Sequence, residues 1–404
     1  MERRHEIVIV GGGQAGLAMS YYLSKQDRNH IILEQSDKVG ESWRNKWDSF
    51  TLVTPNWMNR LPGFPYAGDD PDGFITRDEV VSYLEDYVEL FNPPIEFNFP
   101  VTSVEKKKDY GYLVRGRELE VEAKVVIVCT GAFHVPKIPA ISNGVPAHIL
   151  KLHTSQYKNP ESISDGSILV VGSGQSGCQI AEELNESGRQ VYLSISSCGR
   201  LPRRYRGKDG VWWMNELGMF DVTTDRLESP RMKFACNPHL SGKGGGHEIN
   251  LHHLNRDGVI LLGYLDAASK GKMRFMPNLA EKLEDVDRFA NNFKKQVDIH
   301  IRKHQLSFPE ENGTGSISNP QKKEITNLDL EEAGIKTIIW GTGYTPDFSW
   351  IHLPVFDEKG HPIQKRGVTS STGLYFLGFN WLNKLKSGLL FGVGDDASFI
   401  ASVI

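Results

Sequence analysis

The sequence has few cysteines and no long apolar run. Only four cysteines occur among 404 residues, none in a C-x-x-C pair, so a disulfide scaffold, a zinc site and a dithiol redox centre are not predicted. No apolar run approaches the ~18 residues that a membrane-spanning helix needs. The stretch IVIV near the first residue is too short for a signal peptide. We therefore expect a cytoplasmic protein that does not cross a membrane.

The sequence also has no large excess of positive or negative charge. Lys and Arg number 46 against 50 Asp and Glu, a net charge of -4, which gives no overall attraction to nucleic acid or to an anionic membrane. The histidines His247, His252 and His253 lie beside a GGG run without a matching carboxylate or cysteine pattern, so no metal site is predicted. The expected partners are small molecules, and the oligomeric state stays open.

What the chain does contain is a duplicated glycine-rich turn. IVIVGGGQAG over residues 7–16 and ILVVGSGQSG over residues 168–177 each place G-x-G-x-x-G after a β-branched run. In this pattern the first glycine permits a tight turn, the second lets the backbone approach a pyrophosphate, and the third lets a helix pack on the strand. One copy could be a plain tight connection, but two copies predict two bound dinucleotides. The candidate contacts are Gly11, Gly13, Gln14, Ala15 and Gly16, then Gly172, Gly174, Gln175, Ser176 and Gly177.

Each glycine turn is followed by a helix-forming stretch and a second strand, and the two copies differ at the end of that strand. HIILEQS over residues 30–36 is a strand that ends near Glu34 and Gln35. An acid there can accept hydrogen bonds from a ribose diol, although a plain solvated strand end is the alternative. RQVYLSIS ends at Ser196, and Arg200 follows it with no acid between them, which suits a 2′-phosphate. The asymmetry predicts FAD at the first turn and NADPH at the second. The basic stretch continues through Arg203, Arg204, Arg206 and Lys208, as a phosphate clamp or as a solvated loop.

The remaining patterns predict an α/β fold of two Rossmann-like dinucleotide-binding domains, with the NADPH domain inserted in the FAD domain. VVIVCTG is a strand that stops at Thr130 and Gly131, two candidate cofactor contacts, and the prolines of AFHVPKIPA suggest that the chain then leaves the domain. TIIWGTGYTP suggests a return to the first domain, with Gly343 lining the junction. We expect residues 1–150 to form the first part of the FAD domain, 151–330 the NADPH domain and 331–404 the C-terminal part of the FAD domain.

Three further segments follow from local pattern. Apolar residues three to four apart predict a helix over residues 279–304 with Leu279, Leu283, Val286, Phe289, Phe293, Val297 and Ile301 on its packed face. Residues 310–321, rich in Gly, Ser, Asn and Pro, predict a linker. KSGLLFGVGDDASFIASVI predicts a glycine loop and a final helix, and the backbone near Leu389 could approach the flavin.

Taken together, GGGQAG, CTGAFHVPKIP, VVGSGQSGCQIAEEL and WGTGY resemble the class B flavin-dependent monooxygenases over nearly the whole chain. WDSFTLVTPNWMNRLPGFPY is most similar to a bacterial branch of that family. The resemblance implies that NADPH reduces FAD and that a C4a-hydroperoxyflavin passes one oxygen atom of O2 to a small-molecule substrate, by N- or S-oxygenation or related chemistry.

The resemblance also implies site residues. GESWR, with Trp43 and Arg44, corresponds to the family's loop over the FAD pyrophosphate and flavin, and Val101 corresponds to its adenine-contacting strand. Animal members carry an Asn beside the flavin; TLVTPNW offers Thr54 and Asn56 there, and we take Asn56 as the catalytic candidate.

The family stretch F-x-G-x-x-x-H-x-x-x-Y is half present. His153 and Tyr157 fit it, while Ala147 and Ile149 stand in place of Phe and Gly. Tyr157 is followed by Lys158 rather than forming a Trp-Pro pair, which argues against Baeyer-Villiger chemistry. Two other functions stay open: an NAD(P)H-dependent flavin reductase or oxidase with a non-disulfide acceptor, and a non-catalytic flavin-binding sensor.

Overall fold

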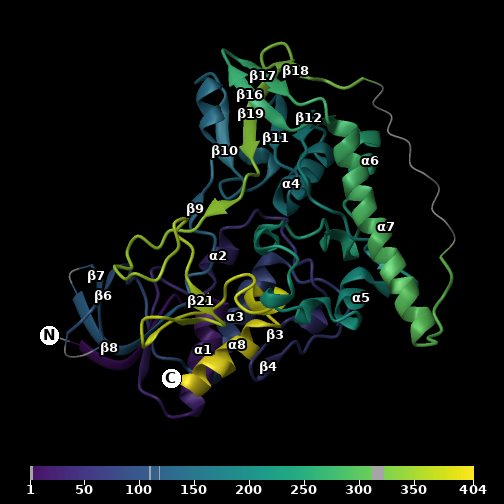
Figure 1. Ribbon diagram of the computed structural model, residues 1–404. Helices are drawn as coiled ribbons and strands as arrows, with labels where there is room; N and C mark the ends of the chain where they lie inside the picture. The colour runs from purple at the N-terminus through teal and green to yellow at the C-terminus, as the bar shows by residue number, and fades with distance from the viewer. Residues whose placement is uncertain (1–2, 109–110, 118, 312–322) are drawn as a thin grey trace.

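Two parallel sheets form the framework of the molecule. The computed structural model describes residues 3–108, 111–117, 119–311 and 323–404 (Figure 1). The first sheet has the parallel order β23-β8-β1-β2-β5 and the second has the order β10-β19-β11-β12-β15. Their bounds are β1 Arg3–Val10, β2 His30–Leu33, β5 Ile95–Glu96, β8 Leu119–Val128, β23 Leu374–Phe376, β10 Leu150–His153, β11 Ser167–Val171, β12 Val191–Ser194, β15 Ile260–Leu262 and β19 Ile335–Trp340. The predicted pair of Rossmann-like units is confirmed.

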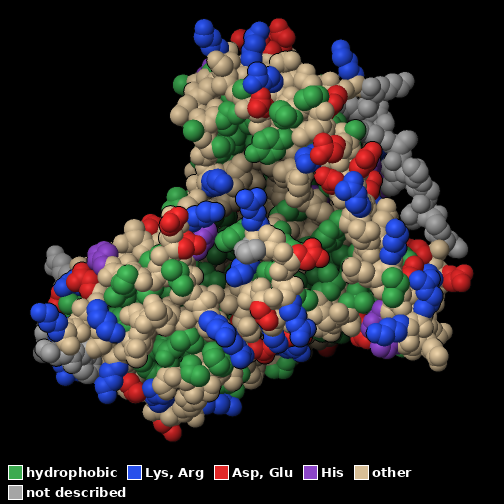
Figure 2. Space-filling model, viewed as in Figure 1, with side chains coloured by type: hydrophobic (Ala, Val, Ile, Leu, Met, Phe, Trp, Pro, Cys, Tyr) green, Lys and Arg blue, Asp and Glu red, His purple; other side chains and the backbone are tan. Residues whose placement is uncertain are grey.

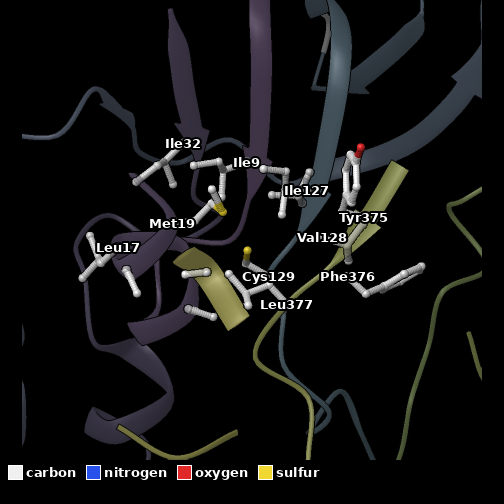
Figure 3. Close-up of a cluster of buried hydrophobic side chains, with 14 of the residues drawn as sticks. Ile9, Leu17, Met19, Ile32, Ile127, Val128, Cys129, Tyr375, Phe376 and Leu377 are labelled. Atoms are coloured by element: carbon white, nitrogen blue, oxygen red, sulfur yellow. The ribbon is translucent and has the colours of Figure 1, made fainter. Parts of the chain in front are cut away.

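The two sheets repeat one arrangement down to the strand register. Val10 at the end of β1 pairs with Leu33 of β2, and Val171 at the end of β11 pairs with Ser194 of β12. The β-branched runs that precede both glycine turns are almost fully buried, as parallel strands covered on both faces require. Figure 3 shows the resulting core of the first unit, where Ile9 and Ile127 from neighbouring strands face Met19 of the following helix.

Helices cover the parallel strands. α1 (Gln14–Lys25) and α4 (Gln175–Glu186) begin inside the two glycine turns, and the C-terminal α8 (Val393–Val403) packs against α1 (Figure 1). α2 (Glu41–Arg44) and α3 (Arg77–Phe91) follow β2, and Thr76 and Glu79 form a capping box that fixes the start of α3. α5 (Gly210–Glu216) and α6 (Leu251–Arg256) belong to the long segment between β12 and β19.

Antiparallel strands extend the first sheet and decorate both units. β6 (Val101–Lys106) and β7 (Tyr112–Gly116) pair beside β8, and β21 (Gln364–Lys365) and β22 (Val368–Thr369) continue the other edge beyond β23. β16 (Leu265–Ser269), β17 (Lys272–Phe275) and β18 (Asn327–Asp329) form a small separate sheet. Two short hairpins are β3 (Arg60–Leu61) with β4 (Phe64–Pro65) and β13 (Arg204–Tyr205) with β14 (Lys208–Asp209).

The chain crosses between the units twice, and the two crossings lie side by side. β9 (Val135–Pro136) and β20 (Tyr344–Thr345) pair antiparallel at the junction (Figure 1). The first crossing comes before β10, close to the expected boundary at residue 150. The second comes after Trp340, because β19 pairs with β10 and β11 in the second sheet. Membership of the second sheet therefore ends about ten residues later than the expected boundary at 330, since the strand of TIIW completes that sheet.

The predicted long helix is present as α7 (Leu279–Lys303). Its buried face comprises Leu279, Leu283, Val286, Ala290, Phe293 and Val297. Phe289, placed on that face from the sequence, is 40% exposed, because Ala290 continues the helical repeat there instead. Most of the linker predicted over residues 310–321 lies outside the described residues. No helix in the described part of the chain is long and apolar enough to cross a membrane.

Candidate functional site

The first glycine turn is closely packed except at its middle glycine. Gly11 has φ +103° and lies against the carbonyl of Cys129, and a Cβ on Gly16 would overlap the carbonyl oxygen of Gly11. A Cβ on Gly13 would meet no atom within 4 Å. The first and third glycines are therefore required by packing, whereas Gly13 faces open space at the start of α1, where a pyrophosphate fits.

The second turn repeats this geometry. Gly172 has φ +104° and lies against the carbonyl of Gly341, and a Cβ on Gly177 would overlap the carbonyl oxygen of Gly172. A Cβ on Gly174 again meets nothing within 4 Å. Ser176 is half-buried in the first turn of α4. Both turns thus offer the same space to a phosphate group.

The buried carboxylate of Glu34 faces the first turn. Its Oε2 accepts a hydrogen bond from the Gly12 amide at 2.6 Å, and its Oε1 accepts one from the Ser36 amide at 2.9 Å. The Phe99 amide donates to the Glu34 carbonyl at 2.7 Å, which brings the segment before Val101 to the same edge. Gln35 is exposed. Val101 thus follows two residues after a backbone contact of Glu34, and the assignment of both residues to an adenosine site stays a prediction.

A glutamine follows each middle glycine and fastens a distant loop over its turn. Gln14 Nε2 donates to the Gly388 carbonyl at 2.8 Å, which holds the segment leading to Leu389 beside the first turn. Gln175 Oε1 accepts from the Leu240 amide at 3.0 Å, and its Nε2 donates to the Leu240 carbonyl. Next to Gln14, Ala15 packs against Gly378 after β23. The two units therefore cover their turns in the same way with unrelated loops.

Between the turns, the junction contains an unpaired buried hydroxyl and two open glycines. Thr130 Oγ1 is buried and has no hydrogen-bond partner among the described residues. Gly131 and Gly343 both have positive φ, and a Cβ on either would meet nothing within 4 Å. His153 Nε2 lies 2.9 Å from the Gly343 carbonyl oxygen, and burial lowers the pKa of His153. This combination leaves room for a ligand with polar atoms.

Sequence reasoning missed Lys46, which lies at the same junction. Its Nζ is 5.5 Å from the ring centroid of Phe133, and burial lowers the pKa of its ammonium group. The nearby charge of Lys46 contributes to the lowered pKa of His153. The only local signal for Lys46 is its place two residues after the GESWR segment.

The residues carried over from the family resemblance are mostly engaged in local contacts. Trp43 packs on Phe50 with ring centroids 5.9 Å apart, and Arg44 pairs with Glu85. Tyr157 donates a hydrogen bond to Glu183 Oε2 at 2.7 Å. This bond connects the loop that follows β10 to α4.

Asn56 is buried and its side-chain amide is hydrogen-bonded on both sides. Its Nδ2 donates to the Asp70 carbonyl at 2.9 Å, while its Oδ1 accepts from the Ile75 amide at 2.9 Å and from Asn59 Nδ2 at 3.2 Å. These bonds hold the loop over residues 56–75 together. A catalytic role for Asn56 stays a prediction.

Two carboxylates already neutralise Arg200. Its guanidinium pairs with Glu248 and, at 2.9 Å, with Asp287 of α7. Ser196 lies closer to the turn, with its amide donating to Ser173 Oγ at 2.8 Å. In the basic stretch that follows, ion pairs also join Arg203 and Arg204 to Asp209 and Arg206 to Asp298.

Beyond these residues, a cavity of about 450 Å³ opens between the loop after Asn56 and the basic stretch. Its walls include two indole rings, and Lys208 Nζ lies 5.3 Å from the ring centroid of Trp212. Figure 2 shows the molecule hollowed between its two units on the face drawn, with Lys and Arg side chains around the hollow. The cavity is lined by Trp57, Pro71, Asp72, Arg204, Gly207, Lys208, Asp209, Trp212 and Asn215.

Comparison with known proteins places this geometry in a family. A model described as pyridine nucleotide-disulphide oxidoreductase matches residues 8–208. An oxidoreductase named CzcO-like from Geobacillus kaustophilus is 34% identical over 100% of this chain and 99% of its own length. The chain belongs to the pyridine nucleotide-disulphide oxidoreductase family.

One further relative is similar in sequence and one solved structure is similar in fold. Indole-3-pyruvate monooxygenase YUCCA6 of Arabidopsis thaliana is 31% identical over 98% of this chain and 89% of its own length. A solved structure of a flavin-containing monooxygenase from Stenotrophomonas maltophilia shares the fold, with a TM-score of 0.67 at 18% identity over 99% and 98% of the two chains. The resemblance read from the sequence motifs is thereby confirmed.

Membership of the pyridine nucleotide-disulphide oxidoreductase family makes this chain a flavin-dependent oxidoreductase that binds FAD and NAD(P)H. The two open middle glycines and the unpaired Thr130 hydroxyl fit these groups. The described residues contain no cluster of three or more His, Cys, Asp or Glu side chains arranged to hold a metal ion.

Proposed function

We propose that the protein is an FAD-dependent monooxygenase that uses NADPH and oxygenates a small-molecule substrate. The observation that carries the proposal is the pair of equivalent glycine turns, each open at its middle glycine, on either side of one junction. The monooxygenase relatives support oxygenation as the reaction.

FAD is assigned to the first unit and NADPH to the second, inserted unit. The buried Glu34 carboxylate would accept hydrogen bonds from the ribose diol of FAD and would repel a 2′-phosphate. The second turn has no acid at that strand end, and Ser196 and Arg200 stand there instead. This difference favours FAD at Gly13 and NADPH at Gly174.

When bound, FAD would accept a hydride from NADPH and, with O2, supply the oxygen atom that reaches the substrate. The chain's own residues would position the groups and exclude water. Gln14 and Gln175 hold covering loops over the turns, and the Gly131 and Gly343 backbones leave space at the junction. Lys46 would place a positive charge beside bound phosphate or other anionic atoms.

Oxygen transfer can be tested directly with the purified, FAD-loaded protein. NADPH-dependent O2 consumption would be measured with amines, thioethers, ketones and indolic acids; the indole rings and Lys208 of the cavity favour aromatic acids in that panel. Isotopically heavy O2 should place one labelled oxygen atom in the product of any stimulating substrate.

The same preparation discriminates the alternatives. A reductase would oxidise NADPH without O2 when a quinone or dye acceptor is present, and its products would carry no label. A flavin-binding sensor would consume negligible NADPH under either condition. Either result would refute the monooxygenase proposal.

A further inference from the structure

Two segments far apart in the sequence lie side by side next to the second glycine turn. Residues 197–201 follow β12, and residues 236–240 come from the long segment after α5. The His239 amide donates to the Gly199 carbonyl at 2.8 Å, and the Leu201 amide donates to the His239 carbonyl at 3.3 Å. These bonds make a parallel bridge between Arg200 and His239.

The bridge brings Cys198 and Cys236 together. The two thiols lie close enough to shift each other's pKa. Each thiol also reaches the neighbour of the other, since Cys198 Sγ lies 3.2 Å from the Asn237 carbonyl oxygen and Cys236 Sγ lies 3.6 Å from that of Ser197. Their separation of 38 residues explains why the cysteine spacing did not predict a dithiol.

The two cysteines differ in access to solvent. Cys198 is 1% exposed, whereas Cys236 is an exposed free cysteine. Interaction with the Cys198 thiol lowers the pKa of Cys236, which increases its thiolate fraction, and interaction with Cys236 raises the pKa of Cys198. An exposed nucleophilic thiol beside a buried second thiol is the arrangement of an attacking and a resolving cysteine.

We propose that Cys236 and Cys198 form a reversible dithiol-disulfide site that reacts with low-molecular-weight disulfides such as oxidised glutathione. The Cys236 thiolate attacks one sulfur of the disulfide and releases one thiol, which takes up the proton lost by Cys236. Cys198 then attacks the Cys236 sulfur and releases the second thiol with its own proton. Two protein thiols are thus oxidised while one small disulfide is reduced to two thiols.

The site is connected to the second glycine turn. Leu240, next to the bridge, is the residue that Gln175 holds, and His239 Nε2 contacts the Ser173 carbonyl within the turn. A disulfide would tie this covering segment covalently to the end of β12. The proposal does not depend on monooxygenase activity.

The test uses reduced, FAD-loaded protein treated with oxidised glutathione, followed by alkylation of the remaining thiols and mass spectrometry of whole protein and peptides. Wild type should lose two of its alkylatable thiols, retain no glutathione and yield a crosslinked Cys198–Cys236 peptide. Reduction with dithiothreitol should restore both thiols.

Variants separate the roles of the two cysteines. Cys198→Ala should retain one glutathione on Cys236, because no resolving thiol is present, whereas Cys236→Ser should lose no thiol. Cys129→Ser and Cys178→Ser serve as matched controls, since both replace buried cysteines and should leave the crosslink intact.

Three results would overturn the proposal. The first is stable glutathionylation of wild-type Cys236 without a crosslink. The second is a crosslink to Cys178 rather than Cys198, and the third is the same loss of thiols in Cys236→Ser as in wild type. The wild-type peptide map gives an answer even where a variant folds poorly.

Discussion

Gly13 and Gly174 occupy equivalent positions in the two turns, and each faces space that a pyrophosphate would fill. Because a Cβ at either position would meet no atom within 4 Å, we expect a leucine there to leave the fold intact and to block the approach of phosphate to the helix N-terminus. We expect Gly13→Leu to purify colourless, without FAD. Gly174→Leu should stay yellow and lose at least about tenfold in NADPH affinity, the effect of losing about 1.4 kcal/mol of binding free energy.

Flavin absorbance and NADPH titration measure these outcomes, and each variant is the control for the other. A Gly13→Leu protein that keeps its colour would place the flavin elsewhere.

Arg200 is proposed to read the 2′-phosphate, but it must do so while paired with Glu248 and Asp287. A charge-assisted hydrogen bond contributes about 1.5–3 kcal/mol, so Arg200→Ala should raise the KM for NADPH by about 10- to 100-fold. The KM for NADH should change much less. Steady-state kinetics with both nucleotides measure the difference.

Glu248→Gln is the matched variant for Arg200. Removing one carboxylate beside the guanidinium should lower the KM for NADPH, because a dianionic phosphate is then repelled less. Equal effects of Arg200→Ala on NADPH and NADH would mean that Arg200 does not contact the 2′-phosphate.

For single residues, spacing along the sequence predicted the position of Glu34 but not the ion-pair partners of Arg200. The distance from Gly11 to Glu34 is set by one βαβ unit, so it can be read from the sequence. Glu248 and Asp287 reach Arg200 only through the packing of α7 and the loop before α6, and no local pattern contains that information. Lys46 and the Cys198–Cys236 pair were missed for the same reason.

At the scale of single elements, α7 joins two apolar clusters of the molecule. Its first half packs with the second sheet through Leu283 and Val286, and its second half packs through Phe293 and Val297 against Trp213 and its neighbours. The helix therefore anchors the segment that carries the cavity and the basic stretch.

Phe293→Ala tests this anchoring. Phe293 is 3% exposed, and truncating a buried phenylalanine costs about 3–5 kcal/mol, which should lower the Tm by several degrees. Phe289→Ala, four residues earlier on a 40% exposed side chain, should lower it far less. Thermal unfolding of both variants gives the comparison, and similar shifts would mean that Phe289 carries as much of the packing as Phe293.

The repeat of apolar residues predicted the bounds of α7 to within one residue. It did not show that Ala290, rather than Phe289, is the buried residue. A hydrophobic side chain beside the buried stripe fits a looser three-to-four spacing equally well, and only the neighbouring surface decides which residue is covered. The strand that contains TIIW is a second example. Its apolar run predicts a strand, but the sequence does not show which of the two sheets the strand joins.

At the scale of the whole molecule, the two units meet at the β9–β20 crossings and at the side chains beside them. Lys46 belongs to the first unit, contacts Phe133 before β9, and acts electrostatically on His153 of the second sheet. A buried ammonium group with a lowered pKa costs stability unless an anion is present. Such a cost is expected where a site receives phosphate groups.

Lys46→Met should therefore stabilise the nucleotide-free protein at neutral pH. The folded state holds the Lys46 proton less tightly than the unfolded state, so the cost applies below the lowered pKa and disappears as the pH rises past the ordinary value of 10.5. The Tm advantage of the variant should shrink on going from neutral pH toward about pH 10. Lys38→Met, at an exposed lysine, should show little change at either pH.

Binding of NADP+ should favour wild type over Lys46→Met in Tm. Phosphate groups near Lys46 would compensate its buried charge, so saturating NADP+ should raise the Tm of wild type more than that of Lys46→Met. Equal NADP+ shifts in wild type, Lys46→Met and Lys38→Met would show that the Lys46 charge lies outside the reach of the nucleotide. A larger shift in wild type and in Lys38→Met than in Lys46→Met would show that a residue of the first unit senses the ligand of the second, and that the junction is one site shared by both.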